Sequence, residues 1–208
     1  MQLQKTLLII KHDGVARGLI GEIIKRFEKV GLKMVALEFI AATEDMGDKH
    51  YPNSNAWKRK VGNRTLTEYK EKGIDPIERL GTDDPIKIGE MVKTWLIEYL
   101  SSGPVLAMVW EGPEAVKIVR KLVGETNPTN ALPGTIRGDF SWDNADLANE
   151  QKRPFYNLVH ASGSIEEAEA EIKLWFSDSE IFDYKTHASI PMGMYGKIKN
   201  FMRKSKDG

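Results

Sequence analysis

The sequence has no cysteine among its 208 residues. This excludes a disulfide framework, a cysteine nucleophile and a cysteine-ligated zinc site. It also has no net charge, because 30 Lys and Arg balance 30 Asp and Glu, so nothing attracts it generally to nucleic acid or anionic lipid. No apolar run approaches the ~20 residues of a membrane span, and the first residues lack a leader cleavage site. We therefore expect a soluble, cytoplasmic, globular protein with no membrane partner.

The familiar nucleotide-binding loops are missing too. Gly14, Gly18 and Gly21 do not have the dinucleotide-binding spacing, and the Gly196-Lys197 pair lacks the other residues of a Walker loop. The four histidines are too scattered along the chain to predict a metal site; they are His12, His50, His160 and His187.

Apolar residues make up 41% of the chain, which is enough for a real core. Short buried runs predict strands, and apolar residues at helical spacing predict the helices between them. We expect strands at 6–11, 33–42, 105–110 and 157–160, and helices at 19–27, 92–100, 115–123 and 165–176. This order predicts an α/β sandwich, an antiparallel sheet with helices on one side. Ser164 and Glu167 have the spacing of a capping box at the last helix.

Two polar stretches interrupt the pattern, at about residues 52–89 and 141–153. The first is charged and rich in turn residues, which is typical of an insertion of short helices and loops without a second core. We interpret residues 1–183 as one domain with these two insertions, and residues 184–208 as a loosely held C-terminal tail.

Basic and small polar residues gather at the ends of these elements. Lysine and arginine suit phosphate oxygens, and threonine and asparagine suit ribose or phosphate hydrogen bonds. A histidine among such cations is a candidate phosphate acceptor, because neutral imidazole is nucleophilic near pH 7. The alternatives are a structural histidine at a strand end and ordinary surface charges. The residues concerned are Lys11, Arg120, Thr126, Arg137, Asn157 and His160.

Several long strings resemble the motifs of nucleoside diphosphate kinases. They are KHDGVARGLIGEII (11–24), SGPVLAMVWEG (102–112), GETNP (124–128), PGTIRGDF (133–140) and NLVHAS (157–162). The resemblance runs in order from Lys5 to Phe176, broken by the two insertions. It implies a ferredoxin-like αβ sandwich with a four-stranded antiparallel sheet covered by helices.

The resemblance also implies an activity. The γ-phosphate of a nucleoside triphosphate such as ATP or GTP passes to a histidine and then to ADP or another nucleoside diphosphate, in a ping-pong reaction. Mg²⁺ is held mainly by the nucleotide phosphates, with no direct protein ligand. A homo-oligomer, hexamer or tetramer, is implied as well, with no specific nucleic-acid partner.

Carried over by position, His160 matches the phosphorylated histidine, and Ser162 and Glu171 match the pair that orients it. Lys11, Tyr51, Arg120, Thr126, Arg137 and Asn157 match contacts to phosphate, ribose and the reacting groups. Val92 and Leu96 fall where the family holds the base. The fixed carboxylate and the clustered cations fit what phosphoryl transfer needs.

Some positions depart from the family pattern. His12 replaces a proline, which we interpret as a solvated turn residue, or alternatively as a second titrating group. Ala161 replaces a glycine and would be strained if its φ were positive, and Gly163 replaces an aspartate. Val92 stands where the base-stacking aromatic is expected, so Trp57 of the first insertion is a candidate replacement, or else an anchor for that insertion.

Two other functions fit the same fold. A catalytically inactive nucleotide-binding regulator would have lost the histidine or the cations, yet all are present. A nucleic-acid binder would need a basic face and exposed aromatics on the sheet, whereas these strands carry aliphatic residues.

Overall fold

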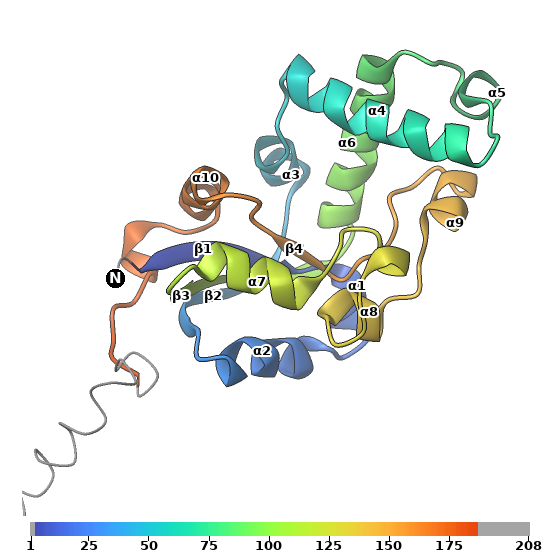
Figure 1. The fold of residues 1–208 in the computed structure, drawn as a ribbon. Helices are drawn as coiled ribbons and strands as arrows, with labels where there is room; N and C mark the ends of the chain where they lie inside the picture. The colour runs from blue at the N-terminus through green and yellow to red at the C-terminus, as the bar shows by residue number, and fades with distance from the viewer. Residues whose placement is uncertain (1–2, 187–208) are drawn as a thin grey trace, which may run out of the picture.

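The computed structural model describes residues 3–186, with one antiparallel sheet of four strands at its centre (Figure 1). The strands are β1 (Gln4–Ile10), β2 (Lys33–Ala41), β3 (Pro104–Gly112) and β4 (Val159–Ala161). Their order across the sheet is β2-β3-β1-β4, with every neighbouring pair antiparallel. The predicted α+β sandwich is confirmed.

Helices cover both faces of this sheet. They are α2 (Ile20–Lys29), α3 (Glu44–His50), α6 (Pro85–Ser101), α7 (Ala115–Val123) and α10 (Ile165–Trp175). Successive strand residues point to opposite faces, so Leu8 and Ile10 pack with α2 and α7, whereas Leu7 and Ile9 pack with α6 and α10. The expectation of helices on one side was wrong, because a strand that is apolar at every position needs cover on both faces.

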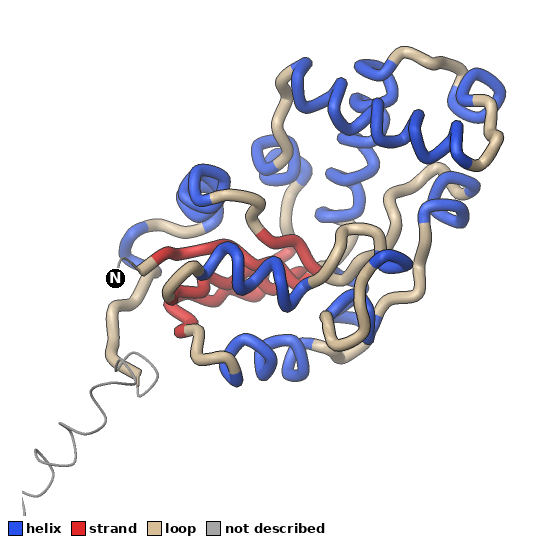
Figure 2. The backbone as a smooth tube through the Cα atoms, in the orientation of Figure 1, coloured by secondary structure: helices blue, strands red, loops and turns tan. Residues whose placement is uncertain are grey.

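Most of the first polar stretch lies in a helical arm (residues 55–96), which projects from the sandwich in Figures 1 and 2. It contains α4 (Asn55–Glu71), α5 (Pro76–Leu80) and the first part of α6. The expectation of short helices without a core was wrong here. Helix α4 has 17 residues, and Tyr69, Leu80 and Ile88 form a small buried cluster of the arm's own.

Two glycines let α4 and α6 cross with their backbones in contact. A Cβ atom on Gly62 would lie 1.9 Å from the carbonyl oxygen of Pro85, and one on Gly89 would lie 2.1 Å from that of Lys58. Neither distance is possible for a real side chain, so only glycine fits at both positions. The corner between the two helices is therefore set by main chain, with no side chain between them.

The remaining elements are short. They are α1 (His12–Ala16), η1 (Pro128–Asn130), α8 (Ile136–Phe140), α9 (Ala145–Glu150) and η2 (Asp178–Glu180). The expected tail is held where it begins, since the Tyr184 hydroxyl donates to the Met34 carbonyl at 2.6 Å. Residues 187–208 of that tail lie outside the described residues. Within the part of the chain that is described, no helix has the length and apolar character needed to cross a membrane.

Candidate active site

A cleft with a volume of about 280 Å³ lies between the helical arm and the sandwich. Such a volume is close to the lower end of the range for small-ligand pockets, roughly 300 Å³. Nine of the predicted site residues line it: Lys11, Tyr51, Val92, Leu96, Arg120, Thr126, Arg137, Asn157 and His160. The structure thus brings into one place residues that the sequence spreads over 150 positions.

His160 is oriented by the other two predicted residues, Ser162 and Glu171. Its Nε2 donates to Glu171 Oε1 at 2.9 Å, and the Ser162 hydroxyl donates to Oε2 of the same carboxylate at 2.6 Å. Burial raises the pKa of Glu171, but the neighbouring His160 ring and these hydrogen bonds outweigh burial and hold that pKa below its usual value. With Nε2–H on the carboxylate, Nδ1 carries the free lone pair of the ring.

Lys11 is buried at the end of β1, where its Nζ donates to Asn157 Oδ1 at 2.9 Å. The ammonium also lies 4.3 Å from the centre of the Tyr99 ring. Burial, with a contribution from the charge of Arg137, lowers the pKa of Lys11 to about 7. Lys11 therefore changes charge near neutral pH, and a bound anion would favour its charged form.

Arg137 is buried and bonds mainly to main chain. Its guanidinium donates to the carbonyls of Asn157, Gly124 and Val159 at 3.1, 3.0 and 2.6 Å. Burial lowers the pKa of Arg137 to about 10, so it stays charged at neutral pH. By contrast, Arg120 on α7 is exposed at the cleft. The two predicted arginines thus differ in what they do, because only Arg137 also holds β4 in place.

Leu158 enters β4 with a left-handed backbone, at φ 68°. For a leucine this conformation costs roughly 1–2 kcal/mol. Its N–H donates to Asp13 Oδ2 at 3.1 Å, and its carbonyl accepts from the Lys11 N–H at 2.8 Å. These two bonds hold the strained turn that separates Asn157 from the strand bearing His160.

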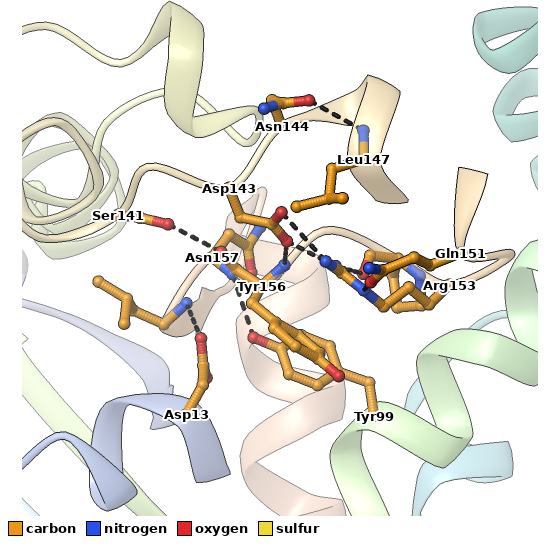
Figure 3. Close-up of polar contacts among 12 residues, drawn as sticks. Asp13, Tyr99, Ser141, Asp143, Asn144, Leu147, Gln151, Arg153, Tyr156 and Asn157 are labelled. Carbon is orange, nitrogen blue, oxygen red and sulfur yellow. Dashed lines mark hydrogen bonds and ion pairs between the residues drawn. The ribbon is translucent and has the colours of Figure 1, made fainter. Parts of the chain in front are cut away.

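The second polar stretch packs behind Asn157, as Figure 3 shows. Asp143 accepts from Arg153 at 2.6 and 3.2 Å and from the Tyr156 N–H at 2.6 Å. The Tyr156 ring packs on that of Tyr99, whose hydroxyl accepts from the Asn157 N–H at 3.1 Å. The stretch from Ser141 to Arg153 therefore closes a loop that supports Asn157 from outside the cleft.

The outer end of the cleft lies in the angle between α4 and α6. Val92, Leu96 and Val61 give it an apolar surface. Trp57 does not line the cleft; it packs against the buried cluster on the face of the sheet that α6 and α10 cover. The hypothesis that it replaces the stacking ring was therefore wrong, and Trp57 anchors the arm. The tryptophan that lines the cleft is Trp95, on α6, which also packs against the arm's own cluster.

The structure shows the surroundings of three of the four positions that depart from the family pattern. His12 is not a solvated turn residue: its ring packs edge-on against Tyr99 and Tyr156, with centroids 5.1 and 5.8 Å apart. Burial also lowers the pKa of His12, so it adds no charge at neutral pH. Ala161 lies within β4 without a positive φ. Gly163 donates its N–H to Glu167 at 2.8 Å.

Four residues at this site were not predicted from the sequence, namely His50, Tyr99, Asp13 and Trp95. His50 ends α3 and touches the His160 ring, while Tyr99 and Asp13 hold the main chain around Asn157 and Leu158. Asp13 lies within the motif string 11–24, and Tyr99 lies three residues before the string 102–112. These positions could have indicated that both residues belong to the site. Nothing in the local sequence of His50 indicates its contact with β4.

A cleft lined by basic side chains, with a lone pair on a carboxylate-held histidine, suits transfer of a phosphoryl group through that histidine. Fold and site together therefore define a phosphotransferase of the αβ-sandwich type.

Comparisons with known proteins identify the family. The sequence model described as "Nucleoside diphosphate kinase" matches residues 4–70 and 89–181. A nucleoside diphosphate kinase of Pyrobaculum aerophilum is 53% identical over 88% of this chain and 100% of its own length. The crystal structure of an NDP kinase from that organism covers 88% of this chain and all of the other, at 51% identity and a TM-score of 0.86.

A second solved structure is a transition-state mimic of the Borrelia burgdorferi nucleoside-diphosphate kinase with bound vanadate and ADP. It is 41% identical, covers 90% of this chain and 95% of its own, and has a TM-score of 0.70. The chain belongs to the nucleoside diphosphate kinase family. The family match leaves out residues 71–88, which lie within the helical arm.

Proposed function

We propose that this nucleoside diphosphate kinase works through a phosphohistidine on His160. The Nδ1 lone pair attacks the γ-phosphorus of a nucleoside triphosphate, and the bond from that phosphorus to the β,γ-bridging oxygen breaks. The diphosphate leaves with the electron pair. A second nucleoside diphosphate then takes the phosphoryl group back from Nδ1 in the reverse sense. The observation that carries this proposal is the His160–Glu171–Ser162 chain beside buried cations.

Glu171 keeps the proton on Nε2 and stabilises the positive charge that the ring gains as Nδ1 attacks. Lys11 and Arg120 face the phosphates, where fixed cations stabilise the charge of the transferring group. Arg137 adds its charge while holding Asn157 and Val159. Thr126 and Asn157 offer hydrogen bonds to phosphate or ribose oxygens, and the Tyr51 hydroxyl supplies one more.

The base lies in the outer part of the cleft, against the apolar faces of Val92 and Leu96. Trp95 supplies an aromatic surface there, held by the cluster of the helical arm. Stacking on such a surface contributes ~1–3 kcal/mol per base and does not depend strongly on base identity. Both purine and pyrimidine nucleotides, including ATP, GTP and ADP, are therefore substrates.

Members of this family generally use a divalent metal. Mg²⁺ prefers carboxylate and phosphate oxygens, but the acids at this cleft are engaged. Glu68 pairs with Arg64 at 3.2 Å, and Glu171 is held by His160 and Ser162. We therefore infer that Mg²⁺ would be held by the nucleotide phosphates, whose charge it would partly neutralise, without a direct protein ligand.

The active form is a homo-oligomer that uses the edge of β2. This strand is an edge strand of the sheet, and it carries Leu37 and Phe39, which are 51% and 57% exposed. An exposed apolar edge strand favours pairing with a second copy. Sedimentation of the wild-type chain and of Phe39→Asp tests this, since we expect the variant to dissociate. A cytoplasmic location and the lack of a nucleic-acid partner stay predictions from the sequence.

The mechanism is tested by incubating the protein with γ-³²P-labelled ATP. We expect label that is labile in acid and stable in alkali, and that leaves on addition of a nucleoside diphosphate. The His160→Asn variant should fold and take no label, because it has lost the nucleophile. Label on that variant would place the acceptor elsewhere, and an unlabelled wild-type chain would favour the inactive nucleotide-binding alternative.

A further inference from the structure

His50 is a buried histidine that touches the ring of His160. It ends α3, is 6% exposed, and its ring centroid lies 4.4 Å from that of His160, with the two planes at 78°. It does not line the cleft, although its neighbour Tyr51 does. His50 therefore contacts the nucleophile from the protein side without reaching a nucleotide.

A single hydrogen bond fixes the tautomer of His50. Trp175 Nε1 lies 3.3 Å from His50 Nδ1, and an indole N–H can only donate. Nδ1 must then be the acceptor, so the proton of the neutral ring is on Nε2. Nε2 is buried and has no hydrogen-bond partner among the described residues.

This tautomer excludes a metal site that the atom positions alone would suggest. Nitrogen and oxygen atoms of His50, His160 and Glu171 lie within 4.8 Å of one another. A metal ion needs a lone pair from each ligand, yet His50 Nδ1 is occupied by Trp175 and Nε2 carries a proton. The cluster is therefore organised around the ring of His160 and not around a cation.

We propose that His50 is a positioning residue for phosphoryl transfer: its ring, held by Trp175, fixes the plane of the His160 imidazole so that Nε2 stays on Glu171 and Nδ1 is the nitrogen that attacks. This role rests on the proposed function of His160. Without the ring of His50, the His160 side chain has empty space on one side and can rotate away from Glu171.

The charge of His50 fits the same role. Burial lowers the pKa of His50 to about 3, with a further contribution from the His160 ring. The ring is thus neutral throughout the working range of pH. A positive charge at this place would oppose the charge that the His160 ring gains as Nδ1 attacks phosphorus. A neutral ring orients the nucleophile without this opposition.

The test combines single-turnover phosphorylation by ATP with ¹⁵N NMR of the His160 ring. We expect His50→Ala to lower the phosphorylation rate at saturating ATP by about ten- to a hundredfold, as small misplacements of reacting groups do. The dissociation constant for ATP should not change. The NMR spectrum should show His160 as a mixture of its two tautomers. His50→Phe restores a ring at this place and should recover most of the rate and the single tautomer.

Ile97→Ala serves as the matched control, because it removes a side chain from the apolar cluster that contains Tyr51 and Trp175, two neighbours of His50. It should lower the melting temperature without changing the rate or the tautomer. If His50→Ala has the wild-type rate, or if it loses rate no more than Ile97→Ala and keeps one tautomer, the proposal is wrong. If the wild-type chain itself takes no label, the proposed function fails, and the NMR comparison still decides whether His50 orients His160.

Discussion

Lys11 should make nucleotide binding depend on pH, with proton uptake on the alkaline side of neutrality. Its pKa is lowered to about 7 by burial and by Arg137, so at pH 8 only about one tenth of the free protein carries the charge. A nucleotide phosphate beside the ammonium favours the charged form and raises the pKa in the complex. Binding at pH 8 should therefore take up about 0.9 proton per site, against about 0.5 at pH 7.

The sign of the effect follows from the same linkage. Lys11 is already charged well below pH 7, so affinity there gains nothing from further acidification. As the pH rises through 7 the free protein loses the charge that the nucleotide needs. Affinity should then fall by up to about tenfold per pH unit, until the pKa of the complex is reached. Arg137, with its pKa lowered only to about 10, stays charged over this range.

Isothermal titration calorimetry with ADP measures this uptake directly, by comparing buffers with different ionisation enthalpies at one pH. Lys11→Met keeps the length of the side chain and removes its charge, so it reports the protons contributed by the nucleotide and by other groups. The reasoning is refuted if wild-type and Lys11→Met proteins take up equal numbers of protons at pH 8. It is also refuted if wild-type affinity does not change between pH 7 and pH 9.

Four further predictions concern the cleft and its walls. Arg120→Ala should lower kcat/KM by about 10²–10³, the effect of losing one preorganised donor, with an unchanged melting temperature because the side chain is exposed. Arg137→Ala should in addition lower the free energy of unfolding by about 3 kcal/mol, since three main-chain carbonyls lose their donor; equal melting curves for the two arginine variants would contradict this. Gly62→Ala gains up to ~1 kcal/mol in helix propensity. The added Cβ clashes with main chain, and this overpacking costs roughly 1–3 kcal/mol. The cost outweighs the gain, so the melting temperature should fall by several degrees. The exposed Asn63→Ala is its control and should not destabilise. Trp95→Ala should raise KM for ADP, GDP and CDP by similar factors; an unchanged KM for all three would show that the base is not held there.

The fold could be predicted well from sequence because its signals are local. A run such as Leu7–Ile10, apolar at every position, requires a strand with cover on both faces. The motif strings then specify how the strands are connected. The arm was harder to predict, because α4 has few apolar residues and meets α6 through main chain at Gly62 and Gly89, so its hydrophobic pattern is weak.

For the candidate site, the sequence predicted which residues gather but few of their contacts, the exception being the pair Ser162 and Glu171 that orients His160. The structure gathers all eleven predicted residues, yet Arg137 donates three hydrogen bonds to main-chain carbonyls. Trp57 anchors the arm. His50 escaped prediction because His160 is 110 positions away and the packing of α3 against α6 and α10 brings the two rings together. Trp95 escaped because its exposure to the cleft depends on the angle between two helices.

The glycine crossing of α4 and α6 has a consequence for turnover. A ping-pong enzyme admits and releases a nucleotide twice in each cycle, so any cost of ordering the site recurs with every half-reaction. With main chain in contact at Gly62 and Gly89, this corner cannot widen or narrow through side-chain rotation. The angle between α4 and α6 is then the same whichever rotamers the side chains of this wall adopt. Forming this corner therefore adds no side-chain ordering cost to either nucleotide-binding step.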